Sequence, residues 1–517
     1  MPPSLLMPRL LKLLRDRPSL KVASMVLLSR VLGMARDMFY ARLFGGGALF
    51  DAFATAYRIP NMLRDLLGEG ALSSAVVSRL AQVEAREGRA RVSEVARRLM
   101  AFFGLLLIAV LILGELAAPS FAMALGPGFR DAPGKMELTI FLARVMFPYL
   151  ALVGISALTM GLLHHVRAFG WAASASSFFN LAVMAGTGGC FLLTRDPVFA
   201  VKGAAAAVLA GGVVQWLSLW PGLRGTGISL VPELRFSEPE IRKVLVMIAP
   251  SFLSVAAVQI NVAVNHAFAS YLAEGSVSHI YYAFRLMQLP VGIVGVAIST
   301  VLLTDLSRLH AQGDTGEFSR RMNKAIADVA FLFLPAVAGL GVLGRDVVAL
   351  IYERGHFTAT DTLGTSAALL GYLPGILAIG LNKNLLQGYY ACGDTRYPMR
   401  VACFSIFVNA LLNYTLAFKT SLGIFGLTAG TSVVLFLNTG QLWWGLRKRH
   451  ALRALGRESR GRLWIFTGSA GIMAGVLAGL RTCWADTSVL LRTPVLVGVG
   501  MLVYFGLWAL AREKPNP

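Results

Sequence analysis

The sequence predicts an all-helical polytopic membrane protein, with two parallel six-helix lobes around a central cavity and two further helices at the C-terminus. Three observations predict this class. Of the 517 residues, 56% are hydrophobic and only 15% are charged, whereas soluble proteins carry about a quarter charged residues. Apolar segments near the ~20 residues that cross a bilayer recur along the chain. The third observation is an internal repeat, described below.

The apolar segments predict about fourteen membrane spans. In chain order they cover residues 22–43, 50–83, 97–120, 138–163, 171–194, 200–221, 243–271, 277–305, 325–343, 363–390, 400–419, 424–446, 463–482 and 488–511. The second and eighth spans are long and contain Pro60 and Pro290. Because proline removes a helical hydrogen bond, we expect a kink or a break at each.

The basic residues indicate how the spans are oriented. The net charge is +21, and lysines and arginines gather in alternate loops, above all in LRKRHALRALGRESRGR at 446–462. Positive charge collects in cytoplasmic loops of membrane proteins. We therefore predict that both termini are cytoplasmic, and we assign the basic excess to topology and anionic lipids rather than to nucleic acid.

Two separated segments repeat at one offset. PYLALVGISALTMGLLHHVRAFG begins at Pro148 and GYLPGILAIGLNKNLLQGYYACG at Gly371, so that Tyr149 corresponds to Tyr372. Duplicated lobes are typical of alternating-access carriers, whose substrate site lies between the repeats. The predicted organisation is a basic amphipathic segment 1–21, an N-lobe 22–222, a linker 223–242, a C-lobe 243–447, a basic loop 448–462 and a C-terminal helix pair with its tail 463–517.

Ionisable side chains occur inside the spans, where each costs about 3 kcal/mol at mid-membrane. They are Arg30, Arg36, Asp37, Asp51, Arg58, Arg64, Asp65, Arg79, Arg144, Arg285 and Lys383. One interpretation is structural: Arg30 and Asp37, and likewise Asp51 and Arg58, share a helix face and could lock the first two spans together. Arginines outnumber the acids in the first, second and eighth spans, which favours an anionic ligand. The planar arginine fork suits a phosphate.

Other candidate sites are weaker. The residues His164 and His165 have no carboxylate or cysteine beside them in sequence, so we expect no metal site, and no nucleophile–base pair indicates catalysis. FGGGALFD at 44–51 lacks a phosphate-binding lysine and predicts a tight turn. Four asparagines inside spans could bond across helices or hold a cation: Asn261, Asn265, Asn409 and Asn413.

Three segments resemble the signature of a known family. They are SRVLGMARD at 29–37, DAFATAYRIPNMLRDLLGEGAL at 51–72 and SVSHIYYAFRLMQLPVGIVGVAIST at 276–300. Together they are similar to the MurJ/MviN lipid II flippases of the multidrug/oligosaccharidyl-lipid/polysaccharide exporter superfamily, and the resemblance extends over essentially the whole chain. It implies a cationic central cavity and a groove for the polyprenyl tail on the last two spans.

The resemblance also assigns roles to residues. It implies that Arg30, Arg36, Arg64 and Arg285 bind the substrate, and that Asp37, Asp51, Arg58, Asn61 and Gln288 line the cavity or take part in gating. Three positions depart from the family pattern. Phe284 and Gln288 stand where members often have an acid, and LTDLS at 303–307, with Asp305, stands where members tend to have a proline in LPxLS.

The resemblance implies a transporter rather than an enzyme. It would move lipid II, the undecaprenyl-pyrophosphate-linked peptidoglycan precursor, from the cytoplasmic to the periplasmic leaflet of the bacterial inner membrane by alternating access. We expect no cofactor, with a monovalent cation or the membrane potential as the driving force. Membrane lipids and the cell-wall synthesis machinery are the expected partners of a monomeric protein that supports cell-wall growth and cell shape.

Three other functions stay open. An exporter of another polyprenyl-pyrophosphate-linked oligosaccharide, of the O-antigen type, fits the arginines equally well. A drug/cation antiporter is disfavoured because it would need unpaired carboxylates. A membrane-embedded glycan polymerase or glycosyltransferase would need a catalytic acid in a large extramembrane loop.

Overall fold

The computed structural model describes residues 18–68, 71–194, 196–235, 238–450 and 452–512, and every regular element within these ranges is helical. The predicted N-terminal amphipathic segment lies almost entirely outside the described residues. The chain divides into two compact units, residues 1–259 and 260–517. The sequence predicts a different boundary, a linker at 223–242 between the two lobes, and that two-lobe organisation stays a prediction.

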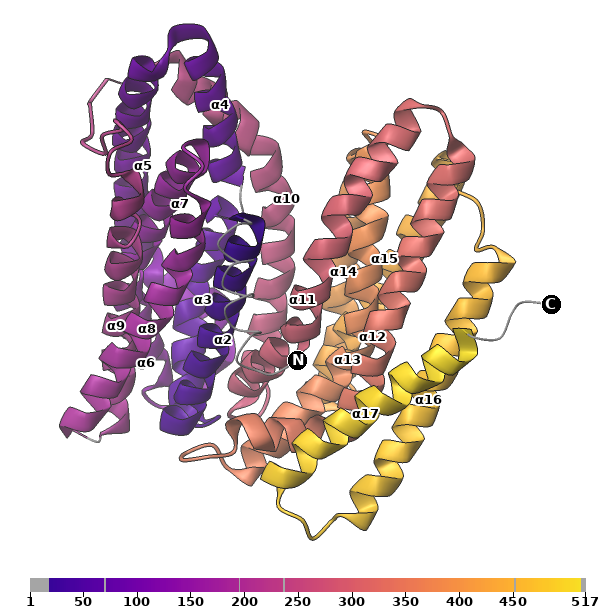
Figure 1. Cartoon of the computed structure of the whole chain (residues 1–517). Coiled ribbons are helices and arrows are strands. Elements are labelled where there is room, and N and C mark those ends of the chain that lie inside the picture. Colours follow the sequence, from indigo (N-terminus) through magenta and orange to yellow (C-terminus); the bar gives the residue numbers. More distant parts are fainter. Residues whose placement is uncertain (1–17, 69–70, 195, 236–237, 451, 513–517) are drawn as a thin grey trace, which may run out of the picture. The chain divides into compact units, whose positions relative to one another are not determined.

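Within the described residues, unit 1 contains eight complete α-helices, two 3₁₀ turns and most of a further helix (Figure 1). Its α-helices are α2 (Pro18–Phe44), α3 (Ala48–Gly68), α4 (Ala71–Glu87), α5 (Arg89–Leu125), α6 (Lys135–Met146), α7 (Tyr149–His165), α8 (Phe169–Thr194) and α9 (Pro197–Leu217), with 3₁₀ turns η1 (Pro127–Asp131) and η2 (Trp220–Leu223). Helix α10 (Pro239–Ser270) begins in unit 1 and ends in unit 2.

Unit 2 holds the remaining helices (Figure 1). They are α11 (Ser276–Ala311), α12 (Thr315–Tyr352), α13 (Ala359–Ala391), α14 (Arg396–Phe418), α15 (Gly423–Arg449), α16 (Arg457–Cys483) and α17 (Val489–Arg512). Helix α13 is at the centre of this unit, because it packs against α11, α12 and α15.

Among the described residues, ten helical segments are long and apolar enough to cross a membrane. The spans predicted at 22–43, 50–83, 243–271 and 277–305 are largely helical but are not among these ten. The first two carry several charges each, since α2 holds Arg30, Arg36 and Asp37 within its apolar stretch. The multi-pass helical class is confirmed, and the number fourteen stays a prediction.

Helix boundaries differ from the predicted spans in two places. The span predicted at 138–163 lies within one segment that is long and apolar enough to cross a membrane, Lys135–His165. A turn divides this segment, because α6 ends at Met146 and α7 begins at Tyr149, immediately after Pro148. Proline lacks the amide hydrogen that would continue the helical ladder. In contrast, α3 continues through Pro60 to Gly68 and α11 through Pro290. The long predicted span 50–83 is therefore two helices that separate after Gly68, rather than one helix broken at its proline.

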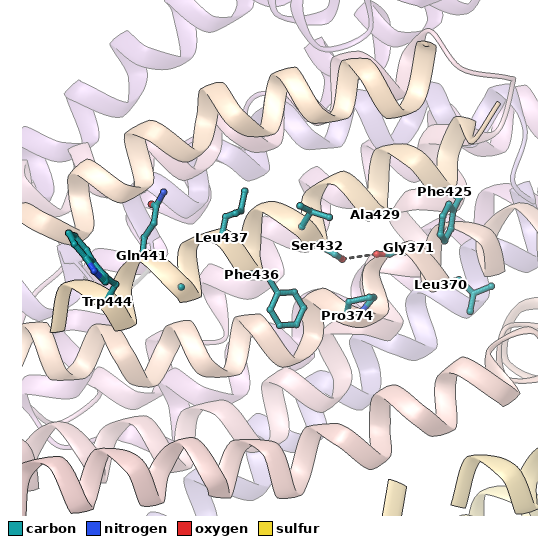
Figure 2. A pocket seen from close by; sticks show the side chains of 12 residues that line it. Leu370, Gly371, Pro374, Phe425, Ala429, Ser432, Phe436, Leu437, Gln441 and Trp444 are labelled. Carbon is teal, nitrogen blue, oxygen red and sulfur yellow. Dashed lines mark hydrogen bonds between the residues drawn. The ribbon is translucent and has the colours of Figure 1, made fainter. Parts of the chain in front are cut away.

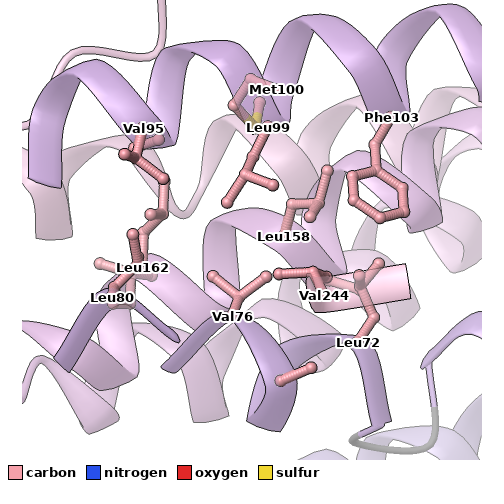
Figure 3. Close-up of a cluster of buried hydrophobic side chains, with 14 of the residues drawn as sticks. Leu72, Val76, Leu80, Val95, Leu99, Met100, Phe103, Leu158, Leu162 and Val244 are labelled. Carbon is pink, nitrogen blue, oxygen red and sulfur yellow. The ribbon is translucent and has the colours of Figure 1, made fainter. Parts of the chain in front are cut away.

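A cluster of buried hydrophobic side chains joins α4, α5, α7 and the start of α10 (Figure 3). Its labelled members include Leu80, Val95 and Leu158, and Val244 is the labelled member from α10. These four side chains are at most 2% exposed. Truncating such a side chain to alanine typically costs about 2–5 kcal/mol. The first half of α10 thus belongs to the core of unit 1.

Ion pairs fasten the segment before α10 to the same helices. Arg98 of α5 donates from Nη1 to Glu238 Oε2 at 2.6 Å, and Arg79 of α4 donates from Nε to Glu240 Oε2 at 2.7 Å. Arg79 therefore has a specific acidic partner. Burial alone would raise the pKa of Glu240, but hydrogen bonds from Lys243 and Arg79 outweigh it and lower this pKa below its ordinary value.

The C-terminal helix pair packs on α12 through a second apolar cluster, which includes Leu343 of α12 with Met473 and Leu496. One carboxylate strengthens this contact. Asp346 of α12 pairs with Arg481 of α16 at 2.7 Å and with Arg492 of α17 at 2.8 Å. Both helices of the pair are therefore tied to α12 by charge as well as by packing.

Candidate functional site

A tight turn positions the charged residues of α2 and α3. Helix α2 ends at Phe44, and Gly45 follows with a φ of 66°, a left-handed conformation that favours glycine. Tyr40 and Phe53 then meet edge to face, with ring centroids 5.1 Å apart. The predicted turn at FGGGALFD is confirmed, and it brings the second half of SRVLGMARD close to the start of α3.

Arg36 and Asp37 form a buried ion pair. Arg36 donates from Nε and Nη2 to Asp37 Oδ1 at 3.2 and 2.9 Å. Only 6% of Arg36 and 2% of Asp37 is exposed, and the Arg36 guanidinium lies 5.7 Å from the Tyr40 ring centroid. Arg30, two turns earlier on α2, is exposed. The two arginines of the motif therefore occupy different environments.

Asp51 is paired with a lysine that the sequence analysis did not select. Lys135, the first residue of α6, donates from Nζ to Asp51 Oδ2 at 2.8 Å, and it also lies 4.1 Å from the Phe129 ring centroid. Asp51 is 1% exposed and Lys135 8%. This ion pair connects α3 to α6, whereas the structural interpretation above considered only partners on the first two spans.

Arg64 lies one turn beyond Pro60 and is partly exposed. It donates from Nη2 to Asp65 Oδ1 at 3.0 Å, while Gln259 Nε2 donates to Asp65 Oδ2 at 3.3 Å. Tyr149, at the start of α7, is close enough to Arg64 and Arg36 to interact with both electrostatically. Two of the three arginines predicted to bind substrate in unit 1, Arg36 and Arg64, thus lie near a common phenol, a residue that the sequence analysis noted only in the repeat.

The remaining predicted residues of unit 1 lie on the same helix. Arg58 is half-buried, and Asn61 is 9% exposed with its side-chain oxygen buried. Tyr57, beside Arg58, stacks on Tyr149 with ring centroids 6.4 Å apart. These side chains belong to α3 or contact it, whereas Arg36 and Asp37 belong to α2, so the predicted site residues of unit 1 are carried by two consecutive helices.

Arg285 is the predicted arginine of unit 2. It is half-buried on α11, donates from Nη2 to Tyr281 Oη at 3.3 Å, and lies 5.1 Å from that ring centroid. Gln288, one turn later, is exposed. Phe284, one of the departures from the family pattern, contacts Tyr372 of α13 edge to face at 6.1 Å. The side chain at position 284 therefore makes an aromatic contact, whereas family members often have an acid there.

Three of the asparagines considered for a cation join one polar cluster in unit 2. Asn413 of α14 donates from Nδ2 to Asn265 Oδ1 at 2.7 Å and to Asn409 Oδ1 at 2.9 Å. Asn265 Nδ2 in turn donates to Thr431 Oγ1 of α15 at 3.4 Å. Two of the three amide oxygens are used in this way, that of Asn413 is buried without a hydrogen-bond partner among the described residues, and no carboxylate joins the cluster. This arrangement fits bonds between helices better than a cation site.

The paired histidines bind neighbours within unit 1. His164 Nδ1 lies 3.3 Å from Ser73 Oγ, and His165 Nε2 lies 3.2 Å from Glu84 Oε2. In the described part of the chain, no group of three or more His, Cys, Asp or Glu side chains could hold a metal ion.

The charge on α2 and α3 is unbalanced toward the positive. The two helices together carry six lysines and arginines against three aspartates. Lys135 of α6 adds a further cation beside Asp51. Because each intramembrane charge is costly, such an excess makes these two helices the candidate functional site. The chemistry available there is the binding of an anion by guanidinium groups and phenols.

The sequence profile of the family described as "Lipid II flippase MurJ" matches residues 40–498. The chain is 32% identical over 505 residues to "Probable lipid II flippase MurJ" of Vibrio cholerae, covering 95% of this chain and 94% of that protein. It is 31% identical over 511 residues to "Lipid II flippase MurJ" of Burkholderia cenocepacia, covering 96% and 97%.

Solved structures share the fold. A structure described as "Lipid II flippase MurJ, inward closed conformation" has a TM-score of 0.79 at 23% identity and covers 95% of this chain and 98% of its own. An inward-facing multidrug resistance transporter of the MATE family in the MOP superfamily has a TM-score of 0.70 at 17% identity, covering 84% and 98%. At these identities the likeness concerns the fold alone.

Proposed function

The chain belongs to the lipid II flippase MurJ family, and on that premise we propose that it carries lipid II from the cytoplasmic to the periplasmic leaflet of the bacterial inner membrane. The protein is then a transporter rather than an enzyme. Two lobes alternate in access, and the polyprenyl tail stays in lipid while the pyrophosphate and sugar–peptide head crosses. Both termini face the cytoplasm in this proposal.

One observation carries the proposal at the level of residues, namely the twofold excess of cations over carboxylates on α2 and α3. We assign Arg36, Arg64 and Arg285 to the pyrophosphate, because a guanidinium donates two parallel hydrogen bonds to a phosphate. The buried pair of Arg36 with Asp37 gives this arginine a carboxylate that the substrate can replace. Exposed Arg30 would attract the head group electrostatically before it binds.

Asp51 has a different role from Asp37 in this proposal. Asp51 is held by Lys135 at 2.8 Å, so it fixes α3 on α6 rather than binding the substrate. Arg58, Asn61 and Gln288 complete the cavity. Moving negative charge outward from a negative interior releases about 2.3 kcal/mol per charge per 100 mV. The membrane potential is therefore the proposed driving force, with a co-transported monovalent cation as the alternative.

An exporter of another polyprenyl-pyrophosphate-linked oligosaccharide is the second candidate. The cation excess fits both substrates equally, because they share the pyrophosphate. Membership of the family favours lipid II. A drug/cation antiporter is less compatible with the site, since a cationic substrate would meet more arginines than carboxylates.

Depletion of the protein in its native host tests the function. We expect lipid II to accumulate in the cytoplasmic leaflet and cells to lyse, because the precursor no longer reaches the cell-wall synthases. The leaflet distribution can be measured with a membrane-impermeant reagent that modifies only outward-facing lipid II. Normal translocation after complete depletion would refute the assignment.

Substitution of the arginines tests the site. We expect Arg36→Ala and Arg285→Ala to lose complementation of the depleted strain while they still insert at normal levels. Arg144→Ala is the control, because Arg144 is exposed on α6 and has no role in the proposed site. Full complementation by both Arg36→Ala and Arg285→Ala would leave these arginines with a structural role only.

A further inference from the structure

An apolar groove of about 650 Å³ follows one face of α15 and the adjoining turns of α13 in unit 2. Figure 2 shows its side chains in a row, from Trp444 past Phe436 to Phe425, with Pro374 and Leu370 of α13 along the other side. The volume lies within the ~300–1,000 Å³ of small-molecule sites.

The walls of the groove suit a hydrocarbon. Its one buried hydroxyl, that of Ser432, donates to Gly371 O at 2.6 Å and accepts from Gly375 N at 3.1 Å. The serine is therefore satisfied within the protein and offers little to a polar ligand. Gly440 forms part of the floor, and a side chain added there would meet no protein atom within 4 Å.

The length of the groove distinguishes between kinds of lipid. Trp444 follows Phe425 by 19 residues on one helix, which corresponds to about 28 Å at ~1.5 Å per residue. This is nearly the whole ~30 Å of a bilayer's hydrocarbon core. An acyl chain of a phospholipid reaches only about half of that thickness, from its own leaflet to the midplane. A long polyisoprenyl chain can occupy the entire groove.

One end of the groove is cationic. The last turn of α15 carries Arg447, Lys448 and Arg449, and Lys448 Nζ lies 5.0 Å from the ring centroid of Trp444. Arg449 is partly engaged by Asp394, 3.8 Å away. A phosphate at this end would be next to Lys448, with the other two basic side chains on the same turn, while its hydrocarbon chain enters the groove beside the tryptophan. The charge and the apolar surface thus match the two parts of a single amphipathic lipid.

We propose that the groove of α13 and α15 holds the polyisoprenyl chain of the phosphate-linked lipid substrate, with its phosphate at the Arg447–Arg449 end. This inference rests on the proposed function and adds a path for the tail on helices outside the C-terminal pair. Lipid tails are as apolar as the groove, so hydrophobic burial gives no preference. The preference comes from close packing along the groove and from the basic end.

Photocrosslinking of the full-length protein in lipid nanodiscs tests the proposal. The probe is a polyprenyl phosphate with a diazirine in its chain, and the modified peptides are identified by mass spectrometry. We expect modification between residues 425 and 444, suppressed by excess undecaprenyl phosphate but not by the same excess of dioleoylphosphatidylglycerol. Equal suppression by the phospholipid would mean that ordinary bilayer lipid fills the groove, and it would overturn the proposal.

Gly440→Leu fills the groove and should lower the crosslinking yield at least about fivefold, which corresponds to about 1 kcal/mol. The matched control is Gly189→Leu on α8, because this glycine is also exposed with no protein atom within 4 Å of an added side chain. We expect the control to crosslink as the wild type does. An unchanged yield in Gly440→Leu would contradict the inference.

A translocation assay on the same wild-type preparation separates the two levels of the argument. Translocation of lipid II without modification of residues 425–444 would refute the groove and leave the function standing. Failure to translocate lipid II would refute the proposed function and this inference with it.

Discussion

Replacing Lys135 by methionine should strongly destabilise unit 1, because it leaves the carboxylate of Asp51 buried without its lysine. The two charged atoms are 2.8 Å apart, so their gross attraction is about 6 kcal/mol at an effective dielectric constant of ~20. Desolvation of both groups offsets much of this attraction. Removing one member of a buried ion pair therefore costs about 3–5 kcal/mol, whereas replacing both costs far less.

A double-mutant cycle measures this coupling. Lys135→Met, Asp51→Asn and the double variant are unfolded in mixed detergent micelles, and helix loss is followed by circular dichroism. We expect the double variant to be more stable than the sum of the single effects predicts, by at least about 2 kcal/mol. Lys202→Met is the matched control, because this exposed lysine of α9 also lies over an aromatic ring, 5.1 Å from Phe141.

Two results would refute this reasoning. We expect the control Lys202→Met to have the same free energy of unfolding as the wild type. If Lys135→Met also has the wild-type value, the ion pair does not stabilise α3. If the double variant is as unstable as the sum of its single changes, the two residues act independently. Complementation gives a separate readout: a double variant that folds but does not complement would show that the Asp51 carboxylate has a role in transport.

Three further changes test other contacts. Asp346→Ala should cost about 3–5 kcal/mol, because it leaves the buried Arg492 and the partly exposed Arg481 without their carboxylate; an unchanged unfolding midpoint would disprove it. Gly371→Ala should cost about 1–3 kcal/mol, since the added carbon would lie 2.0 Å from Thr428 Oγ1, and normal stability would show that α13 and α15 can separate. Despite its burial, hydrogen bonds from Lys243 and Arg79 lower the pKa of Glu240. The ion pair of Glu240 with Arg79 therefore stabilises the fold fully at pH values above the ordinary glutamate pKa. This stabilisation is lost as the pH falls through the lowered pKa. Melting curves at falling pH should show wild type and Glu240→Gln converging, and a constant difference would contradict this assignment.

The sequence was sufficient for the helical membrane class because hydropathy and loop charge depend on composition along each segment. It also identified the charged motif, since Arg36 and Asp37 stand out in an apolar stretch. It could not identify the partner of Asp51. Lys135 lies in a predicted loop, and only folding brings it to a residue 84 positions earlier.

Local breaks were equally hard to predict. Hydropathy is continuous across Pro148, and residues 138–163 do lie in one membrane-crossing segment, but the sequence did not predict that a new helix starts after this proline. At Pro60 the opposite occurred, because the packing of α3 accommodates a proline within the helix. A proline marks a position where a helix can break, and tertiary contacts decide whether it does.

The ion pairs of Asp346 also set an order of assembly during biosynthesis. Its partners Arg481 and Arg492 lie 135 and 146 residues later in the chain. At ~5–20 residues per second, the ribosome reaches the first of them about 7–27 s after it has made the aspartate. Helix α12 is therefore synthesised before either arginine exists, and its carboxylate lacks both basic partners until α16 and α17 arrive. The C-terminal pair completes the folding of a helix synthesised long before it, and a chain truncated ahead of Arg481 would expose that unfinished surface to the cell's quality-control proteases.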